Sequence, residues 1–138
     1  MDSSDSTVAN SHGQDYTEFE KKVYSDFDKE KLTRSQQKAV ESSAYIIQDH
    51  LQESDLSGAL RDLQGNPVTK ANGDYWNHEQ EVREAYAGLV RARNSLEGSL
   101  KNPNLDSETR IFLEKQLNNI LAYQQKVEDI FAEFRGIN

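Results

Sequence analysis

The amino-acid sequence predicts an all-α fold, and three observations support that prediction. Apolar residues recur at spacings of three and four over most of the chain, which is the period of a helix with one buried face. No segment shows the alternating pattern of a strand over more than four residues. Asn102-Pro103-Asn104 separates the two longest helical patterns by a short turn. We therefore expect a small helical domain built on a long C-terminal antiparallel hairpin.

The chain opens on a polar segment. Residues 1–15 are mostly Ser, Asp, Thr, Asn and Gly, so we expect a disordered lead followed by a single all-α domain over residues 16–138. A first helix is expected from Tyr16 to near Lys31, and a second helix after a capping Thr33 or Ser35. The apolar positions of the second helix are Ala39, Val40, Ala44, Ile47 and Leu51.

A loop-like segment precedes the hairpin. Residues 54–77 lack sustained periodicity and contain Gly58, Gly65, Gly73 and Pro67. We expect an ordered loop with at most a short helical turn at 56–63. Loops of this length inside a compact domain are uncommon and are often functional.

The two hairpin helices have the clearest apolar stripes. The first is expected from about Asn77 to Leu100. The second is expected from a cap at Asp106 or Ser107 to a stop at Gly136.

Composition excludes several classes of protein. The 138 residues include no cysteine, which rules out disulfides, thiolate zinc sites and a cysteine nucleophile. No apolar run approaches the roughly 20 residues that span a bilayer, so no membrane-spanning segment is expected. The net charge of −8 disfavours unaided binding of a polynucleotide, because phosphate neutralisation by basic side chains supplies most non-specific affinity.

The segment from Gly65 to Arg83 is the best candidate for a functional site. Two glycines, a proline, the only tryptophan and a histidine lie in one turn-rich stretch that leads into a helix. Binding and catalytic groups often lie on loops held by rigid elements. His78 stands at the helix entrance, where free backbone N–H groups favour an anion such as phosphate.

Other interpretations of His78 compete with catalysis. A histidine on the apolar face of a helix is often a hydrogen-bonded core or cap residue. His78 and Glu81 share a helix face, but two ligands are too few for a metal site. No nucleophile motif supports a serine–histidine–acid triad. Metal-free acid–base chemistry is the functional interpretation that remains.

Several short motifs also resemble a known family. The resemblance is to the polymorphic toxin type 28 domain, found at the C-terminal end of bacterial contact-dependent growth inhibition proteins, and it extends from about Leu56 to Phe134. The motifs are Gly65-Asn66-Pro67-Val68, Tyr75-Trp76-Asn77-His78 with Glu81-Val82, Tyr86 with Gly88-Leu89, and the run Leu96-Glu97-Gly98-Ser99-Leu100-Lys101-Asn102-Pro103-Asn104-Leu105.

The resemblance implies an antibacterial ribonuclease. Such a domain belongs to a larger secreted or surface-displayed effector, is delivered to the cytoplasm of a target bacterium, and is neutralised in its producer by an immunity protein. His78 would act as base or acid on a ribose 2′-OH, and Glu81 would orient its ring or share the proton transfer. Arg61 and Lys70 would stabilise phosphorane charge, and Asp62 would position one of them. The expected site has catalytic residues His78, Glu81, Arg61 and Asp62, substrate-binding residues Lys70, Tyr75, Trp76 and Arg83, and no metal or cofactor.

The resemblance also bears on substrate and partners. We expect tRNA as substrate, and the acidic chain should bind free RNA poorly. Because toxins that this domain resembles use translation factors, we expect elongation factor Tu with GTP to present the tRNA. Exposed aromatic residues of the first helix, or Tyr75 and Trp76, would contact such a carrier. The alternative function is a non-enzymatic, acidic helical interaction protein such as an immunity protein.

Overall fold

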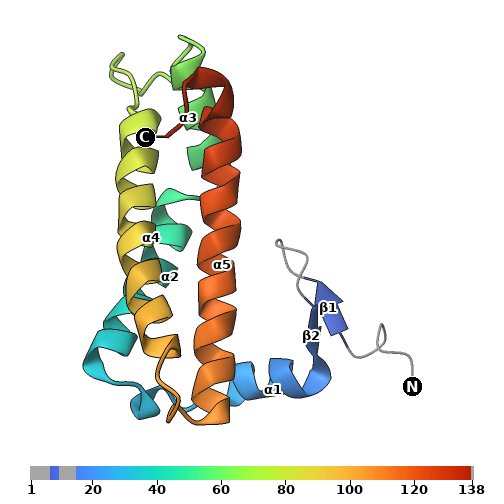
Figure 1. Ribbon diagram of the computed structural model, residues 1–138. Helices are drawn as coiled ribbons and strands as arrows, with labels where there is room; N and C mark the ends of the chain where they lie inside the picture. Colours follow the sequence, from blue (N-terminus) through green and yellow to red (C-terminus); the bar gives the residue numbers. More distant parts are fainter. Residues whose placement is uncertain (1–6, 10–14, 138) are drawn as a thin grey trace.

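The computed structural model describes residues 7–9 and 15–137. The helices of this part are α1 (Glu18–Asp26), α2 (Arg34–His50), α3 (Glu53–Leu63), α4 (His78–Leu100) and α5 (Ser107–Phe131), with 3-10 turns η2 (Lys29–Lys31) and η3 (Ala132–Phe134). The long helices α2, α4 and α5 run side by side, α3 packs on α4 and α5 at one end, and α1 packs on α5 at the other (Figure 1). The predicted all-α fold and the antiparallel hairpin are confirmed.

Side-chain caps lie at the N-termini of the long helices. The Thr33 hydroxyl accepts a hydrogen bond from the Gln36 N–H, and the Gln36 side chain accepts one from the Thr33 N–H, which completes a capping box at α2. Asp106 caps α5 by accepting from the Thr109 N–H at 2.7 Å. That bond, assisted by Lys31, lowers the pKa of Asp106. The carboxylate therefore stabilises the fold above its unfolded pKa, and this contribution is lost as the pH falls through the folded pKa.

The structure corrects the bounds of the predicted loop at 54–77. Its first part is helical, so α3 extends the short turn expected at 56–63, and the loop shrinks to residues 64–77. Glycine costs about 1 kcal/mol in a helix relative to alanine. Ala59 is fully buried and Gly58 is buried beside it, so burial of this face against α4 outweighs the unfavourable propensity of Gly58.

The remaining loop has a defined course. Gly65 follows the end of α3 with a φ of +79°, a conformation that glycine adopts without steric cost. Thr69 and Tyr75 then form an isolated antiparallel bridge. We call residues 68–76 the loop hairpin. It projects from the end of the bundle and delivers the chain to α4 (Figure 1).

The hydrophobic core lies between α2, α4 and α5. Predicted apolar stripes on these helices account for most of it, although Ala44 is exposed rather than buried. Tyr86 of α4 donates a hydrogen bond to Glu128 of α5 at 2.5 Å. Burial, and then this bond, raise the pKa of Tyr86 to about 12, so the hydroxyl remains a donor at neutral pH. The largest fully buried side chains include Leu51, Val82, Leu89, Leu96, Phe112, Leu113, Ile120, Val127 and Phe131.

The N-terminal segment is described only in part. Most of the predicted lead at 1–15 lies outside the described residues, so the lead and its boundary stay predictions. Its described part includes strand β1 (Thr7–Ala9), which pairs antiparallel with β2 (Asp15–Thr17). Helix α1 begins directly after β2 and ends at Asp26, earlier than expected.

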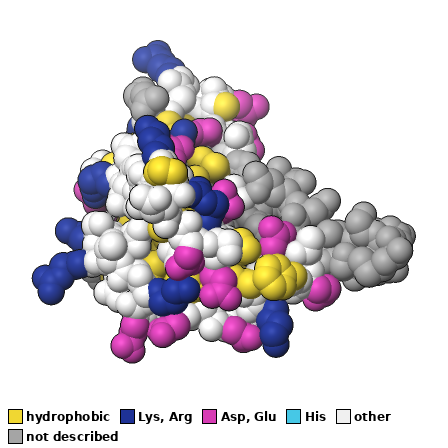
Figure 2. All heavy atoms as spheres, turned by 60° about the horizontal axis from the view of Figure 1, so that its bottom comes forward, with side chains coloured by type: hydrophobic (Ala, Val, Ile, Leu, Met, Phe, Trp, Pro, Cys, Tyr) yellow, Lys and Arg dark blue, Asp and Glu magenta, His cyan; other side chains and the backbone are white. Residues whose placement is uncertain are grey.

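Aromatic residues of α1 divide between core and surface. Tyr24 and Phe27 stack on Phe112, with ring centroids 5.0 and 4.3 Å away. Phe19 is 67% exposed. The end of the molecule near α1 carries interspersed acidic, basic and hydrophobic side chains, with no continuous basic field (Figure 2).

Candidate functional site

His78 is held at the first turn of α4 by close contact with α3. Asn77 caps the helix by accepting a hydrogen bond from the Gln80 N–H at 3.0 Å. The His78 ring packs with its face over Gly58, where a Cβ would lie only 2.4 Å from Nδ1, 2.5 Å from Cγ and 2.8 Å from Cε1. Glycine therefore permits the two helices to approach this closely.

Asp62 lies against the same turn of α4. Its Oδ2 accepts a hydrogen bond from the Glu79 N–H at 2.8 Å, a favourable position for a carboxylate at a helix N-terminus. Asp62 Oδ1 and His78 Nδ1 are both buried and have no hydrogen-bond partner. A buried polar atom without a partner costs roughly 1–3 kcal/mol. Asp62, expected to position Arg61 or Lys70, instead supports the helix turn that carries His78.

Glu81 pairs with a residue that the sequence prediction did not include. Its Oε2 lies 3.1 Å from Nδ1 of His50, the last residue of α2. The expectation that Glu81 orients the His78 ring is therefore replaced by a Glu81–His50 pair. The His50 ring stands edge-on to Tyr45, at 5.8 Å between centroids. Glu81 remains one turn from His78, so both side chains lie on neighbouring positions of one face.

Lys70 and Trp76 extend the site through the loop hairpin. The Trp76 ring is tilted against the His78 ring at 5.7 Å, and Lys70 Nζ lies 4.9 Å from the centre of the Trp76 ring. The contact is a cation–π interaction. Trp76 is 45% exposed and Tyr75 is 64% exposed, so both aromatic rings are accessible beside the histidine.

Two predicted arginines are already bound within the fold. Arg61 Nε donates to the backbone oxygen of Asn66 at 2.9 Å, which fixes the turn after α3. Arg83 makes an ion pair with Glu79 at 3.0 Å and donates to the backbone oxygen of Ile137 at 2.8 Å. Its guanidinium also lies 4.6 Å from the centre of the Phe131 ring. These contacts give Arg83 a structural position between α4 and the C-terminal segment.

The predicted residues thus fall into three groups. His78, Asp62, Trp76 and Lys70 meet around the start of α4, and Glu81 lies one turn further with His50. Arg61 donates to a backbone oxygen, and Arg83 contacts a carboxylate, a backbone oxygen and an aromatic ring. In the part of the chain that the structure describes, no three His, Asp or Glu side chains are grouped so that they could hold a metal ion. No described helix is long and apolar enough to cross a membrane.

These residues define a class: a small helical domain with an imidazole, nearby carboxylates and exposed aromatic rings at the N-terminus of a hairpin helix. The chain belongs to the bacterial toxin 28 family, whose model matches residues 31–133. The resemblance noted from the sequence motifs is confirmed.

The chain is also similar to a protein whose name states an activity. The chain is 39% identical over 75 residues to the tRNA nuclease CdiA of Escherichia coli O6:K15:H31 (strain 536 / UPEC). The aligned segment is 54% of this chain and 2% of that protein, so the chain corresponds to a very small part of its relative.

Proposed function

We propose that this chain is an antibacterial ribonuclease domain that cleaves tRNA by metal-independent acid–base chemistry at the N-terminus of α4. The observation that carries the proposal is that the His78 ring, at the start of α4, packs on Gly58 of α3 beside Trp76 in a member of a toxin family. The name of the relative, a tRNA nuclease, supports the choice of substrate.

The reaction needs two groups that move protons. His78 Nε2 removes the proton from a ribose 2′-OH, and the oxygen attacks the adjacent phosphorus. The 5′-oxygen of the next nucleotide leaves with a proton from the Glu81–His50 pair, which gives a 2′,3′-cyclic phosphate and a 5′-OH. Glu81 lies one turn beyond His78 on α4, and its Oε2 is 3.1 Å from Nδ1 of His50 at the end of α2.

The surroundings stabilise the charge that develops. The ammonium of Lys70, which lies over the Trp76 ring, supplies a positive charge near His78. The Glu79 and Gln80 N–H groups already bond Asp62 and Asn77, so α4 contributes through its helix dipole. Trp76 and Tyr75 offer ring faces on which bases can stack. Asp62 acts as a positioning residue, because it holds the Glu79 N–H next to His78.

Delivery and neutralisation complete the proposal. The domain forms the end of a larger secreted or surface-displayed effector, reaches the cytoplasm of a target bacterium, and is inhibited in the producer by a cognate immunity protein. Membership of a toxin family argues against the alternative, in which this chain is itself an immunity protein or adaptor.

Expression in bacteria tests the function directly. The full chain should stop growth and shorten tRNA while ribosomal RNA stays intact, and co-expression of the immunity protein should prevent both effects. The purified chain should cleave tRNA equally well with and without EDTA. Harmless expression would contradict the ribonuclease proposal. Wholesale loss of ribosomal RNA would contradict tRNA as the substrate.

A carrier for the tRNA follows from the net charge of −8. Long-range repulsion lowers the rate at which an acidic protein encounters free RNA. We expect faster cleavage when elongation factor Tu and GTP present the tRNA. Among the described residues, Phe19, Tyr45, Tyr75 and Trp76 are exposed aromatic residues available for such a contact, whereas Tyr24 and Phe27 stack on Phe112. Equal rates with and without the factor would remove it from the mechanism.

A further inference from the structure

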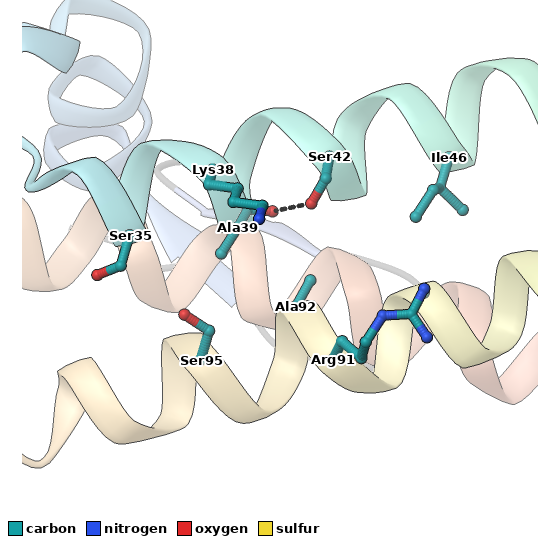
Figure 3. Close-up of a pocket in the computed structure, with 9 residues that line it drawn as sticks. Ser35, Lys38, Ala39, Ser42, Ile46, Arg91, Ala92 and Ser95 are labelled. Carbon is teal, nitrogen blue, oxygen red and sulfur yellow. Dashed lines mark hydrogen bonds between the residues drawn. The ribbon is translucent and has the colours of Figure 1, made fainter.

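A groove runs between α2 and α4, with a volume of about 360 Å³ (Figure 3). Its floor consists of small buried residues, Ala39 on α2 and Gly88 and Ala92 on α4. A Cβ on Gly88 would lie 2.6 Å from Cδ1 of Ile46, so the glycine permits the helices to pack closely here. We call this depression the α2–α4 groove.

The groove leads to the candidate catalytic groups. A second hollow, of about 220 Å³, shares Ile46, Gly88 and Arg91 with the groove and is lined further on by His50 and Glu81. The two hollows are therefore neighbours along the α2–α4 seam, with Ile46 packed on Gly88 between them. Lys38 and His50 are twelve residues apart on α2, which corresponds to about 18 Å at 1.5 Å per residue.

The walls of the groove carry cations and hydroxyl groups. Figure 3 shows Lys38 and Ser42 on α2 facing the side of α4 that bears Arg91 and Ser95. Within the described residues, neither Lys38 nor Arg91 has an ion-pair or hydrogen-bond partner for its side chain. Arg83, by contrast, is bound to a carboxylate.

Among the described residues, no acidic side chain lines the α2–α4 groove itself, whereas Glu81 and Glu84 both line the hollow at its His50 end. Glu41 lines a neighbouring hollow with Lys38. The central part of the groove therefore combines the cationic side chains of Lys38 and Arg91, which have no ion-pair partner among the described residues, with serine hydroxyls and a narrow apolar floor. Phosphate oxygens are bound by Lys, Arg and Ser side chains, and a ribose packs on small apolar groups.

We propose that the α2–α4 groove binds the sugar–phosphate backbone of the RNA strand next to the bond that is cut. Lys38 and Arg91 each neutralise one phosphate, and the strand continues to the Glu81–His50 pair. This inference rests on the proposed ribonuclease function and assigns the substrate a path across the protein. It also gives an acidic chain a local site for a polyanion.

A double charge-neutral variant, Lys38→Gln with Arg91→Gln, tests the groove. Its Kd should be measured with a fluorescein-labelled, 2′-O-methylated single-stranded RNA, which cannot be cleaved through a 2′-OH, over a series of salt concentrations. We expect Kd to rise at least about tenfold. The slope of log K against log salt should fall by about 1.4, since each phosphate contact on a single strand contributes about 0.7. On tRNA, KM should rise and kcat should stay within about twofold.

The matched control is Lys29→Gln with Lys101→Gln, which changes the net charge equally at exposed lysines outside the groove. Equal Kd values and salt slopes for the two double variants would overturn the proposal. So would a groove variant that binds RNA normally but is no longer neutralised by the immunity protein, because the groove would then be a protein interface. RNA binding that depends on the groove in a chain that cleaves no RNA would uphold the groove and reject the ribonuclease.

Discussion

Replacing His78 with alanine is expected to abolish tRNA cleavage, with kcat lowered by roughly 10²–10⁴-fold. Alanine removes both ring nitrogens, including the Nε2 proposed to act as the base. Helix α4 should persist, because alanine is favourable in a helix and the Asn77 cap does not involve the imidazole. Initial rates on purified tRNA, together with circular dichroism and thermal melting, measure the two effects separately.

Two further variants make the result specific to the imidazole. His78→Gln keeps a polar side chain without an ionisable ring and should be as inactive as His78→Ala. Gln80→Ala removes an exposed side chain whose amide bonds Glu84, and it should cleave tRNA at the wild-type rate. Wild-type cleavage by His78→Ala would exclude His78 as base or acid. The Glu81–His50 pair would then be the remaining source of proton transfer.

Helix boundaries could be predicted from the sequence because their causes are local. A capping side chain and its backbone donor are separated by three residues, as at Thr33 and Asp106. The apolar stripes of the hairpin helices repeat within one segment, and their burial follows from that repeat. His78 could be singled out for the same reason, since its turn-rich context lies within a few residues.

The partner of Glu81 could not be predicted, because 31 residues separate it from His50. A histidine in the last turn of a helix is explained by the helix dipole alone. Nothing in the local sequence therefore links His50 to the site. The same limit applies to Arg61 and Arg83. Their residue type suits a phosphate, but their contacts with Asn66, Glu79 and Ile137 depend on how the chain folds back.

Gly58 is the clearest example of a residue whose role is non-local. By propensity a glycine in this position favours a loop, and the predicted loop at 54–77 depends on that interpretation. In the structure Gly58 lies inside α3, and its missing side chain is the space that the His78 ring occupies. The close packing of α3 on α4 therefore explains both the helical position of Gly58 and the position of the His78 ring. The sequence of either segment alone does not reveal this contact.

Gly58→Ala should consequently impair catalysis from outside the reacting groups. The new methyl group would lie 2.4 Å from Nδ1 and 2.5 Å from Cγ of His78, so the ring must rotate or α3 must move away from α4. A misplacement of about 1 Å can cost about 10²-fold in rate, and we expect kcat for tRNA to fall by about that factor. Overpacking typically costs about 1–3 kcal/mol, while the better helix propensity of alanine returns about 1 kcal/mol.

Gly98→Ala is the matched control, because Gly98 lies in α4 and a Cβ there would meet nothing within 4 Å. This variant should cleave tRNA at the wild-type rate and melt at an equal or higher temperature. The comparison separates the loss of a helical glycine from the displacement of the His78 ring. If Gly58→Ala retained the full kcat while folding normally, the position of the ring against α3 would not matter for the reaction. His78 would then have to act from another rotamer, and the geometry proposed for proton transfer would be wrong.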